Sequence, residues 1–207
     1  MPKLNTANPE VRDYLLSVAT YWIENFDIDA WRLDVANEID HQFWKDFRKA
    51  VLAKKPDLYI LGEIWHTSQP WLQGDEFHAV MNYPLSESIK DYFLRGHKET
   101  QLFISEINSQ SMYYKQQISE VMFNLLDSHD TERILTTAKG NIQHVKAALT
   151  FLYLQKGTPC IYYGTELALI GGPDPDCRRV MPWDRVSEDN DMLNFMKKLI
   201  KVRKEVA

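Results

Sequence analysis

The sequence lacks the residues and patterns that define several large classes of protein. Its 207 residues contain only two cysteines, Cys160 and Cys177, too few for a disulfide framework and without the spacing of a metal site. Lys and Arg form no basic block, and the formal net charge of -5 disfavours nucleic acid as a partner. No apolar run is long enough to cross a membrane, and the opening MPKLNTANPE has no apolar signal-peptide core. We therefore expect a cytoplasmic protein with neither a nucleic-acid nor a membrane partner.

Phosphate-binding loops are also missing. No G-x-G-x-x-G or Walker sequence follows a predicted strand, which counts against dinucleotides and nucleoside triphosphates as ligands. The composition that remains is that of an ordinary globular protein, 44% apolar and 12% aromatic. It can supply the core of one domain, or of two at most.

Helical and strand patterns alternate along the chain. The first helix is predicted to begin at Pro9, capped by Asn8, with apolar residues at helical spacing: Val11, Leu15, Val18, Trp22 and Phe26. Further helices are predicted over residues 41–56, 85–96 (capped by Ser86), 98–115, 141–157 and 191–206. Short apolar strands are predicted near residues 31, 60, 80, 124 and 161. This alternation indicates an α/β fold with a parallel sheet covered by helices.

Polar residues gather where these predicted strands end: Asp34, Glu63, Asn82, His129 and Asp130. In a (β/α)8 barrel, chemistry takes place at the carboxyl ends of the strands. Open doubly wound sheets also place their sites there, so position alone leaves both folds open.

Two carboxylates in this set have contrasting sequence surroundings. Arg32 and Asp34 share a strand face, and an arginine beside a carboxylate favours its ionised form, as a nucleophile requires. Glu63 follows an apolar run and precedes Ile64 and Trp65, surroundings that suit a general acid. Such a pair is typical of retaining glycoside hydrolysis. The alternatives are a structural ion pair for Arg32 and Asp34, and a helix-capping or solvated loop residue for Glu63.

The segment LLDSHD supplies a third group. His129 can donate to a sugar hydroxyl, and the Asp130 carboxylate can stabilise positive charge on an anomeric carbon. Alone, the two residues could equally form a local turn.

Several segments together resemble one family of enzymes. DAWRLDVANEID, LGEIWH and LLDSHD resemble the second, third and fourth conserved regions of the α-amylase family of glycoside hydrolases, and GTPCIYYGTE resembles its last barrel strand. Within this family, the segments VANEID, EIWH, VMNYPL and GGPDPDCRRVMPWD resemble those of the neopullulanase, cyclomaltodextrinase and maltogenic amylase branch. The motifs occur in the family's order over nearly the whole chain.

The resemblance implies a role for each matching residue. Asp34 would be the nucleophile, Glu63 the acid/base and Asp130 the stabiliser of the transition state. Arg32 and His129 would hold the nucleophile and the sugar in subsite −1. The other substrate-binding residues implied are Asn37, Glu38 and Trp65 on the acceptor side, Tyr83 in the cleft wall, and Asp174 and Arg178 on the donor side. Packing in the core is the alternative for Trp65, and is the role expected for Met81, Trp22 and Trp44.

The resemblance also predicts a partial (β/α)8 TIM barrel. The five strands would be strands 4–8, without strands 1–3 and the C-terminal β domain. Residues 1–207 would form the C-terminal part of the catalytic barrel, and residues 1–5 the end of the inserted B domain. The family's Asp-x-x-x-Asn-His region on strand 3 has no counterpart. Open sheet edges predict self-association, and we expect little activity from the isolated chain.

Two classes of function follow. The first is a retaining α-glucan hydrolase or transglycosylase acting on maltooligosaccharides, cyclodextrins, starch or pullulan, through α-1,4 and also α-1,6 bonds. The second is a non-catalytic half-barrel or weak sugar-binding module. A phosphatase using Asp34 has little support, because neither metal-binding acids nor a phosphate loop is evident. No cofactor is expected: the wider family allows calcium, but this segment contains no local ligand cluster.

Overall fold

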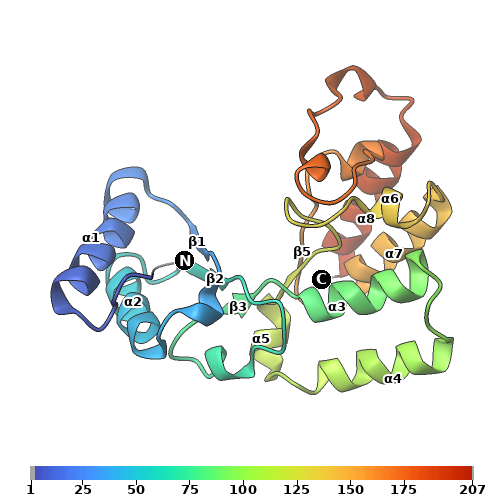
Figure 1. The fold of residues 1–207 in the computed structure, drawn as a ribbon. Coiled ribbons are helices and arrows are strands. Elements are labelled where there is room, and N and C mark those ends of the chain that lie inside the picture. The colour runs from blue at the N-terminus through green and yellow to red at the C-terminus, as the bar shows by residue number, and fades with distance from the viewer. Residues whose placement is uncertain (1–2, 207) are drawn as a thin grey trace. The chain divides into compact units, whose positions relative to one another are not determined.

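The computed structural model describes residues 3–206. Met1 and Pro2, which belong to the predicted end of a B domain, lie outside the described residues. Helices separate the short strands along most of the chain, with only a 3-10 turn between the second and third strands (Figure 1). The α-helices are α1 (Pro9–Phe26), α2 (His41–Lys54), α3 (Tyr83–Ile89), α4 (Thr100–Ser111), α5 (Gln116–Val121), α6 (Ile134–Thr137), α7 (Ile142–Leu154) and α8 (Asp191–Val206). The strands are β1 (Ala30–Leu33), β2 (Tyr59–Gly62), β3 (Ala79–Val80), β4 (Phe123–Asn124) and β5 (Thr158–Pro159).

The chain forms two compact units. Unit 1 comprises residues 1–81 and 114–122, and unit 2 comprises residues 82–113 and 123–207. Unit 1 contains a parallel sheet in the order β1-β2-β3, and unit 2 contains the parallel pair β4-β5. The strands are parallel, as the alternating sequence pattern predicts.

In unit 1, α1 begins where the sequence places its cap, and α2 begins at His41, as predicted. The Asn8 side chain accepts from the Glu10 and Val11 backbone N–H groups, and Pro9 is the first helical residue. Asp40 caps α2 in the same way, and that helix ends two residues before Pro56. Accurate starts on both helices follow from side-chain chemistry that is local in the sequence.

The predicted apolar face of α1 is not the face that unit 1 buries. Ala19 and Ile23 are buried, whereas Val18, Trp22 and Phe26 are 37%, 42% and 58% exposed. The prediction that Trp22 packs in the core is therefore wrong for this chain, whereas Trp44 and Met81 are buried as expected. The physical reason is that α1 is apolar on two sides, and α2 covers only one of them.

Unit 2 has its core between α3, α4, α7 and α8, with Ile89, Leu126, Leu149, Leu152 and Met196 among its most buried residues. The sequence predicts a helix cap at Ser86, but α3 already begins at Tyr83, with Pro84 in its first turn. Ser86 therefore lies inside the helix, buried, and its hydroxyl donates to the Leu126 carbonyl at 3.5 Å. The helix continues as a π-helical segment, η3 (Lys90–Leu94).

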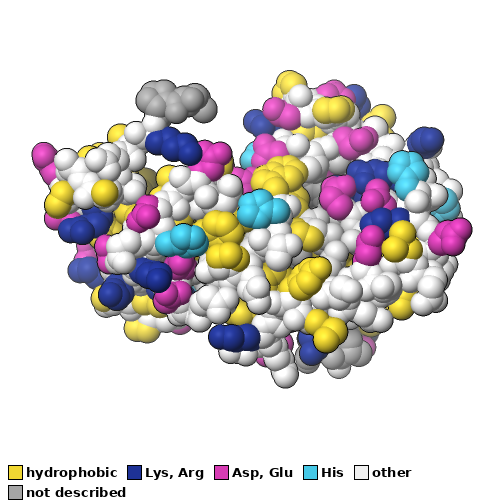
Figure 2. Space-filling model, turned by 60° about the horizontal axis from the view of Figure 1, so that its bottom comes forward, with side chains coloured by type: hydrophobic (Ala, Val, Ile, Leu, Met, Phe, Trp, Pro, Cys, Tyr) yellow, Lys and Arg dark blue, Asp and Glu magenta, His cyan; other side chains and the backbone are white. Residues whose placement is uncertain are grey.

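On the face shown in Figure 2, acidic and basic side chains are interspersed with hydrophobic ones. None of the helices in residues 3–206 combines the length and the apolar character that a membrane span requires.

Candidate active site

The parallel register of β1 and β2 brings two acids of unit 1 to the same edge of the sheet. Leu33 is paired with Gly62, so Asp34 and Glu63 follow at equivalent positions. The Glu63 N–H donates to the Leu33 carbonyl at 2.8 Å, which extends the pairing by one residue. The carboxyl ends of adjacent parallel strands therefore present both carboxylates together.

Arg32 contacts both of these carboxylates. Its Nη1 lies 2.5 Å from Asp34 Oδ1, and its Nη2 lies 2.7 Å from Glu63 Oε1. The second contact is an ion pair without the angle of a hydrogen bond. The Asp34 side chain is largely exposed, whereas Glu63 is only 4% exposed. The sequence predicts Arg32 beside Asp34 alone, with apolar surroundings for Glu63. In the structure one guanidinium links an exposed and a buried carboxylate.

The turn after β1 supplies a further contact to Glu63. The Val35 N–H donates to Glu63 Oε2 at 3.0 Å, and the Ala36 N–H donates to the Glu63 carbonyl at 3.1 Å. Val35 has a φ of 44°, in the left-handed region that β-branched residues rarely adopt. Strained residues of this kind cluster at functional sites. No signal in the sequence marks Val35, because the strain arises from the tertiary position of its N–H.

The acceptor-side candidates of unit 1 are exposed. Asn37 and Glu38 lie on a 3-10 turn, η1 (Ala36–Glu38). The Lys3 ammonium, 2.6 Å from Glu38, lowers the pKa of that carboxyl. Trp65 is 48% exposed, so the alternative that it is a core aromatic does not hold in this chain.

Unit 2 brings together four of the predicted residues. His129 Nε2 lies 3.0 Å from Asp130 Oδ2, and Arg178 Nη2 lies 3.5 Å from Asp130 Oδ1. Arg178 Nε is shared between Asp174 Oδ1 at 2.8 Å and the His129 carbonyl at 3.0 Å. Residues about 45 positions apart in the sequence thus form one polar cluster, with Arg178 at its centre.

A buried layer behind this cluster was not foreseen from the sequence. The Cys177 thiol donates to the His129 carbonyl at 3.1 Å. Arg133 is fully buried, lies over the Tyr162 ring at 4.0 Å, and donates from Nε to the Cys177 carbonyl at 2.7 Å. Asp127 is also buried, accepting from Thr165 Oγ1 at 2.8 Å, and burial raises the pKa of its carboxyl. These groups fix the backbone that carries His129 and Asp130.

The remaining candidate, Tyr83, is the first residue of α3 in unit 2 and is only 2% exposed. Within residues 3–206, no group of three or more His, Cys, Asp or Glu side chains is arranged to hold a metal ion.

Comparison with known families identifies the class of protein. The α-amylase catalytic domain family matches residues 1–207. The chain therefore belongs to the α-amylase family of glycoside hydrolases, and its α/β architecture with parallel strands is that of a partial TIM barrel.

The relatives narrow the branch. The chain is 56% identical over 205 residues to the intracellular maltogenic amylase of Bacillus subtilis (strain 168), covering 99% of this chain and 35% of that protein. It is 47% identical over 207 residues to neopullulanase 2 of Thermoactinomyces vulgaris, covering 100% of this chain and 35% of the relative. A solved cyclomaltodextrinase structure aligns with a TM-score of 0.95 at 51% identity, over 99% of this chain and 35% of that one. The chain thus spans about a third of the length of each relative.

Proposed function

We propose that this chain carries the catalytic acids of a retaining α-glucan hydrolase or transglycosylase that works by double displacement. The observation that carries the proposal is the contact of Arg32 with both Asp34 and Glu63. Retaining enzymes use two carboxyl groups about 5–5.5 Å apart, and inverting enzymes a wider pair. Two carboxylates that share one guanidinium fit the closer arrangement.

The proposed roles divide between the two acids by exposure. Asp34, exposed and paired with Arg32, attacks the anomeric carbon. Glu63, nearly buried, protonates the leaving oxygen and later activates water. Arg32 orients both groups, and the Val35 N–H holds the second oxygen of Glu63.

The polar cluster of unit 2 supplies the remaining proposed contacts. Asp130 stabilises the oxocarbenium-like transition state, and His129 donates to a hydroxyl of the same sugar. Asp174 and Arg178 contact donor-side sugars. That these groups act on the same sugar as Asp34 is proposed from the family pattern of the sequence.

On the acceptor side, Asn37 and Glu38 bind sugar hydroxyls and Trp65 stacks on a ring. The exposed indole of Trp65 supports the stacking role. Tyr83 is retained as a candidate for the cleft wall, although its burial in unit 2 equally fits a packing role.

The proposed substrates are maltooligosaccharides, cyclodextrins, starch and pullulan. They follow from the names of the relatives, which include maltogenic amylase, cyclomaltodextrinase and neopullulanase. A cytoplasmic location is likewise proposed from the relative that is named intracellular.

We further propose that the five strands correspond to barrel strands 4–8, that residues 1–207 form the C-terminal part of the catalytic barrel, and that residues 1–5 end an inserted B domain. A polypeptide of residues 1–207 produced alone would then turn over slowly and self-associate. The competing function is a non-catalytic half-barrel with weak sugar binding. It is favoured by the open edge of β1, which among residues 3–206 pairs with β2 alone.

Trapping of the covalent intermediate tests the mechanism. Incubation with 5-fluoro-α-D-glucosyl fluoride should add one glycosyl group to the peptide that contains Asp34, seen by mass spectrometry. The Asp34→Asn variant should not be labelled, whereas Asp184→Asn, at a residue outside the proposed site, should label normally. Labelling of another carboxylate would overturn the assignment.

Size-exclusion chromatography with light scattering tests the activity of the chain alone. Each fraction is assayed on a chromogenic maltooligosaccharide beside a full-length relative. Turnover more than tenfold below the relative is expected. Turnover within tenfold would refute the proposed loss of activity and the non-catalytic alternative together.

A further inference from the structure

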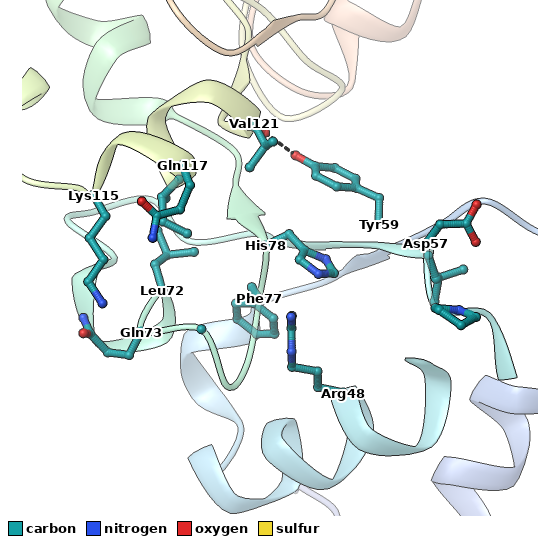
Figure 3. Close-up of a pocket in the computed structure, with 14 residues that line it drawn as sticks. Arg48, Asp57, Tyr59, Leu72, Gln73, Phe77, His78, Lys115, Gln117 and Val121 are labelled. Carbon is teal, nitrogen blue, oxygen red and sulfur yellow. Dashed lines mark hydrogen bonds between the residues drawn. The ribbon is translucent and has the colours of Figure 1, made fainter. Parts of the chain in front are cut away.

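Unit 1 contains a cavity that the candidate active site does not use. It has a volume of about 400 Å³, within the range of small-molecule sites (Figure 3). Its lining comes from α2, the start of β2, residues 72–78 and α5. The connection from β2 to β3 contains a 3-10 turn, η2 (Gln69–Trp71), where a βα unit would place a covering helix. The space beside β2 is therefore only partly filled.

Much of the lining is apolar. Leu58, Leu72 and Phe77 are almost fully buried, and Ile118 and Val121 line the cavity from α5. Tyr59 closes another part of the lining, with its hydroxyl donating to the Val121 carbonyl at 2.7 Å (Figure 3). A ligand that fills this space must present an apolar body.

Arg48 brings a positive charge into this apolar lining. It extends from α2 toward His78 (Figure 3), and its Nη1 donates to the Glu76 carbonyl at 3.2 Å. Among residues 3–206 no carboxylate lies within ion-pair distance of Arg48, and nearby Asp75 pairs with Lys45 at 2.9 Å. Burial lowers the pKa of the Arg48 guanidinium. Most of its N–H groups remain available to a ligand.

Two further polar groups of the lining, His78 and Lys115, also favour an anion, whereas the Asp57 carboxylate of the lining does not. His78 Nδ1 accepts from the Ile60 N–H at 3.0 Å, so a neutral His78 carries its proton on Nε2 and can donate. Lys115 adds an exposed ammonium group at the end of the lining opposite Asp57 (Figure 3). The lining thus combines a half-buried cation and a neutral N–H donor with apolar walls.

We propose that this cavity binds a small organic carboxylate with an apolar chain or ring, its carboxylate on Arg48 and His78 and its apolar part against Leu72 and Phe77. The proposal is independent of the sugar chemistry assigned to the other end of the strands. A bidentate guanidinium contact supplies the specificity for a carboxylate over an alcohol of the same length.

Binding of hexanoate to the 207-residue chain tests the proposal, with 1-hexanol and hexylammonium as probes of equal length. Shifts of the Ile60 and Phe77 backbone amides in NMR titrations report occupancy. Hexanoate should saturate with a Kd of about 1 mM. 1-Hexanol should bind at least tenfold more weakly and hexylammonium not at all. Absence of saturable hexanoate binding, or equal affinity for 1-hexanol, would overturn the proposal.

Substitutions in the lining test whether hexanoate binds in this cavity. Arg48→Met should weaken hexanoate binding about tenfold or more, whereas Lys54→Met, which removes a cation from the same helix outside the cavity, should leave it unchanged. Thermal unfolding verifies that Arg48→Met is folded. Because Lys115 is exposed, Lys115→Met serves as a second variant that folding does not depend on, with an expected two- to threefold loss. Unchanged affinity in both cavity variants would place the ligand elsewhere.

Discussion

At the scale of single residues, Arg32 joins two acids that the sequence separates by 29 positions. It contacts exposed Asp34 and buried Glu63 with different nitrogens. Glu63 also receives the Val35 N–H, so its second oxygen is satisfied. Removing Arg32 would leave a buried carboxylate without its counterion, the situation in which losing one partner is most costly.

Arg32→Met should therefore lower the free energy of unfolding by about 2–3 kcal/mol, measured by urea denaturation at pH 7. The matched control is Arg178→Met, which removes a more exposed arginine that also contacts carboxylates, and should cost less than about 1 kcal/mol. Adding Glu63→Gln to Arg32→Met should recover part of the loss. Equal costs for Arg32→Met and Arg178→Met would contradict the claim that burial of Glu63 sets the magnitude.

His78 should make the free energy of unfolding depend on pH, and its pKa shift fixes the direction. Burial, together with the nearby Arg48 charge, lowers the pKa of His78 to about 4. The unfolded chain, with an ordinary histidine pKa near 6.5, then binds this proton more readily than the folded chain. His78 thus leaves the free energy of unfolding unchanged above about pH 6.5, and lowers it as the pH falls from about 6.5 toward 4.

Between pH 7.5 and pH 5, the wild type should lose about 1 kcal/mol more of its free energy of unfolding than the His78→Gln variant does. This figure allows for partial solvent screening of His78. Urea denaturation at both pH values measures it. His144→Gln, at an exposed position on α7, should leave the pH dependence of the wild type in place. A His78→Gln variant with the same pH dependence as wild type would show that His78 titrates normally.

The residue types of the candidate site could be predicted from the sequence, but their contacts could not. Asp34 and Glu63 directly follow β1 and β2, and Asp130 follows the apolar run that contains β4, so apolar runs in the sequence locate all three. The link from Arg32 to Glu63, and the hydrogen bond from Cys177 to His129, depend on strand register and loop path. Neither contact can be predicted from a local stretch of sequence, because each joins residues that are far apart along the chain.

At the scale of elements, predictions succeeded where local chemistry fixes a boundary. Asn8 accepts from N–H groups of α1, as predicted. Asp40 and Asn141 cap α2 and α7 in the same way, although neither is predicted as a cap from the sequence. Predictions failed where tertiary packing decides, as for Ser86, which became a buried helical residue. The strands predicted near 124 and 161 are reduced to the two-residue β4 and β5.

Two adjacent glycines allow a test of the loop that carries Asp174 and Arg178. A Cβ on Gly171 would lie 2.7 Å from the Asp176 carbonyl oxygen and 2.9 Å from Cys177 Cα, both backbone atoms. A Cβ on Gly172 would meet only the Asp176 side chain, at 3.4 Å. A side chain at residue 171 therefore fits only if the loop backbone shifts, whereas at residue 172 a side chain can move aside.

Gly171→Ala should therefore destabilise the chain by about 1–3 kcal/mol, whereas Gly172→Ala should change stability by less than about 0.5 kcal/mol. Denaturant unfolding measures both. The amide shifts of His129 and Asp130 should move in Gly171→Ala only, since Cys177 and Arg178 hold that backbone. Similar unfolding free energies for the two variants would contradict the close approach.

At the scale of the whole molecule, the chain has the fold of part of a larger domain. Within residues 3–206, β1 pairs with β2 alone, and β1 residues are at least partly exposed. The second apolar side of α1 is also uncovered, with Tyr21, Trp22 and Phe26 in mutual contact. An open strand edge and an aromatic surface both favour association.

Charged substitutions on that surface should reduce association without a loss of stability, because the side chains are already exposed. Trp22→Lys combined with Phe26→Lys should shift the light-scattering mass at about 50 μM toward that of one chain. Met112→Lys, at an 84% exposed position of unit 2, should leave the mass unchanged. If the double variant associates as strongly as wild type, association has another origin.

The interleaving of the two units bears on how the chain is made. Unit 1 needs residues 114–122, but residues 82–113 belong to unit 2 and precede them. A ribosome delivers the chain in order, so residues 1–81 are synthesised, and must wait for α5, while the first segment of unit 2 is being made. At about 5–20 residues per second that wait lasts for seconds. During this time the cavity beside β2 lacks the wall that Ile118 and Val121 provide, and the apolar side chains that line it stay open to water.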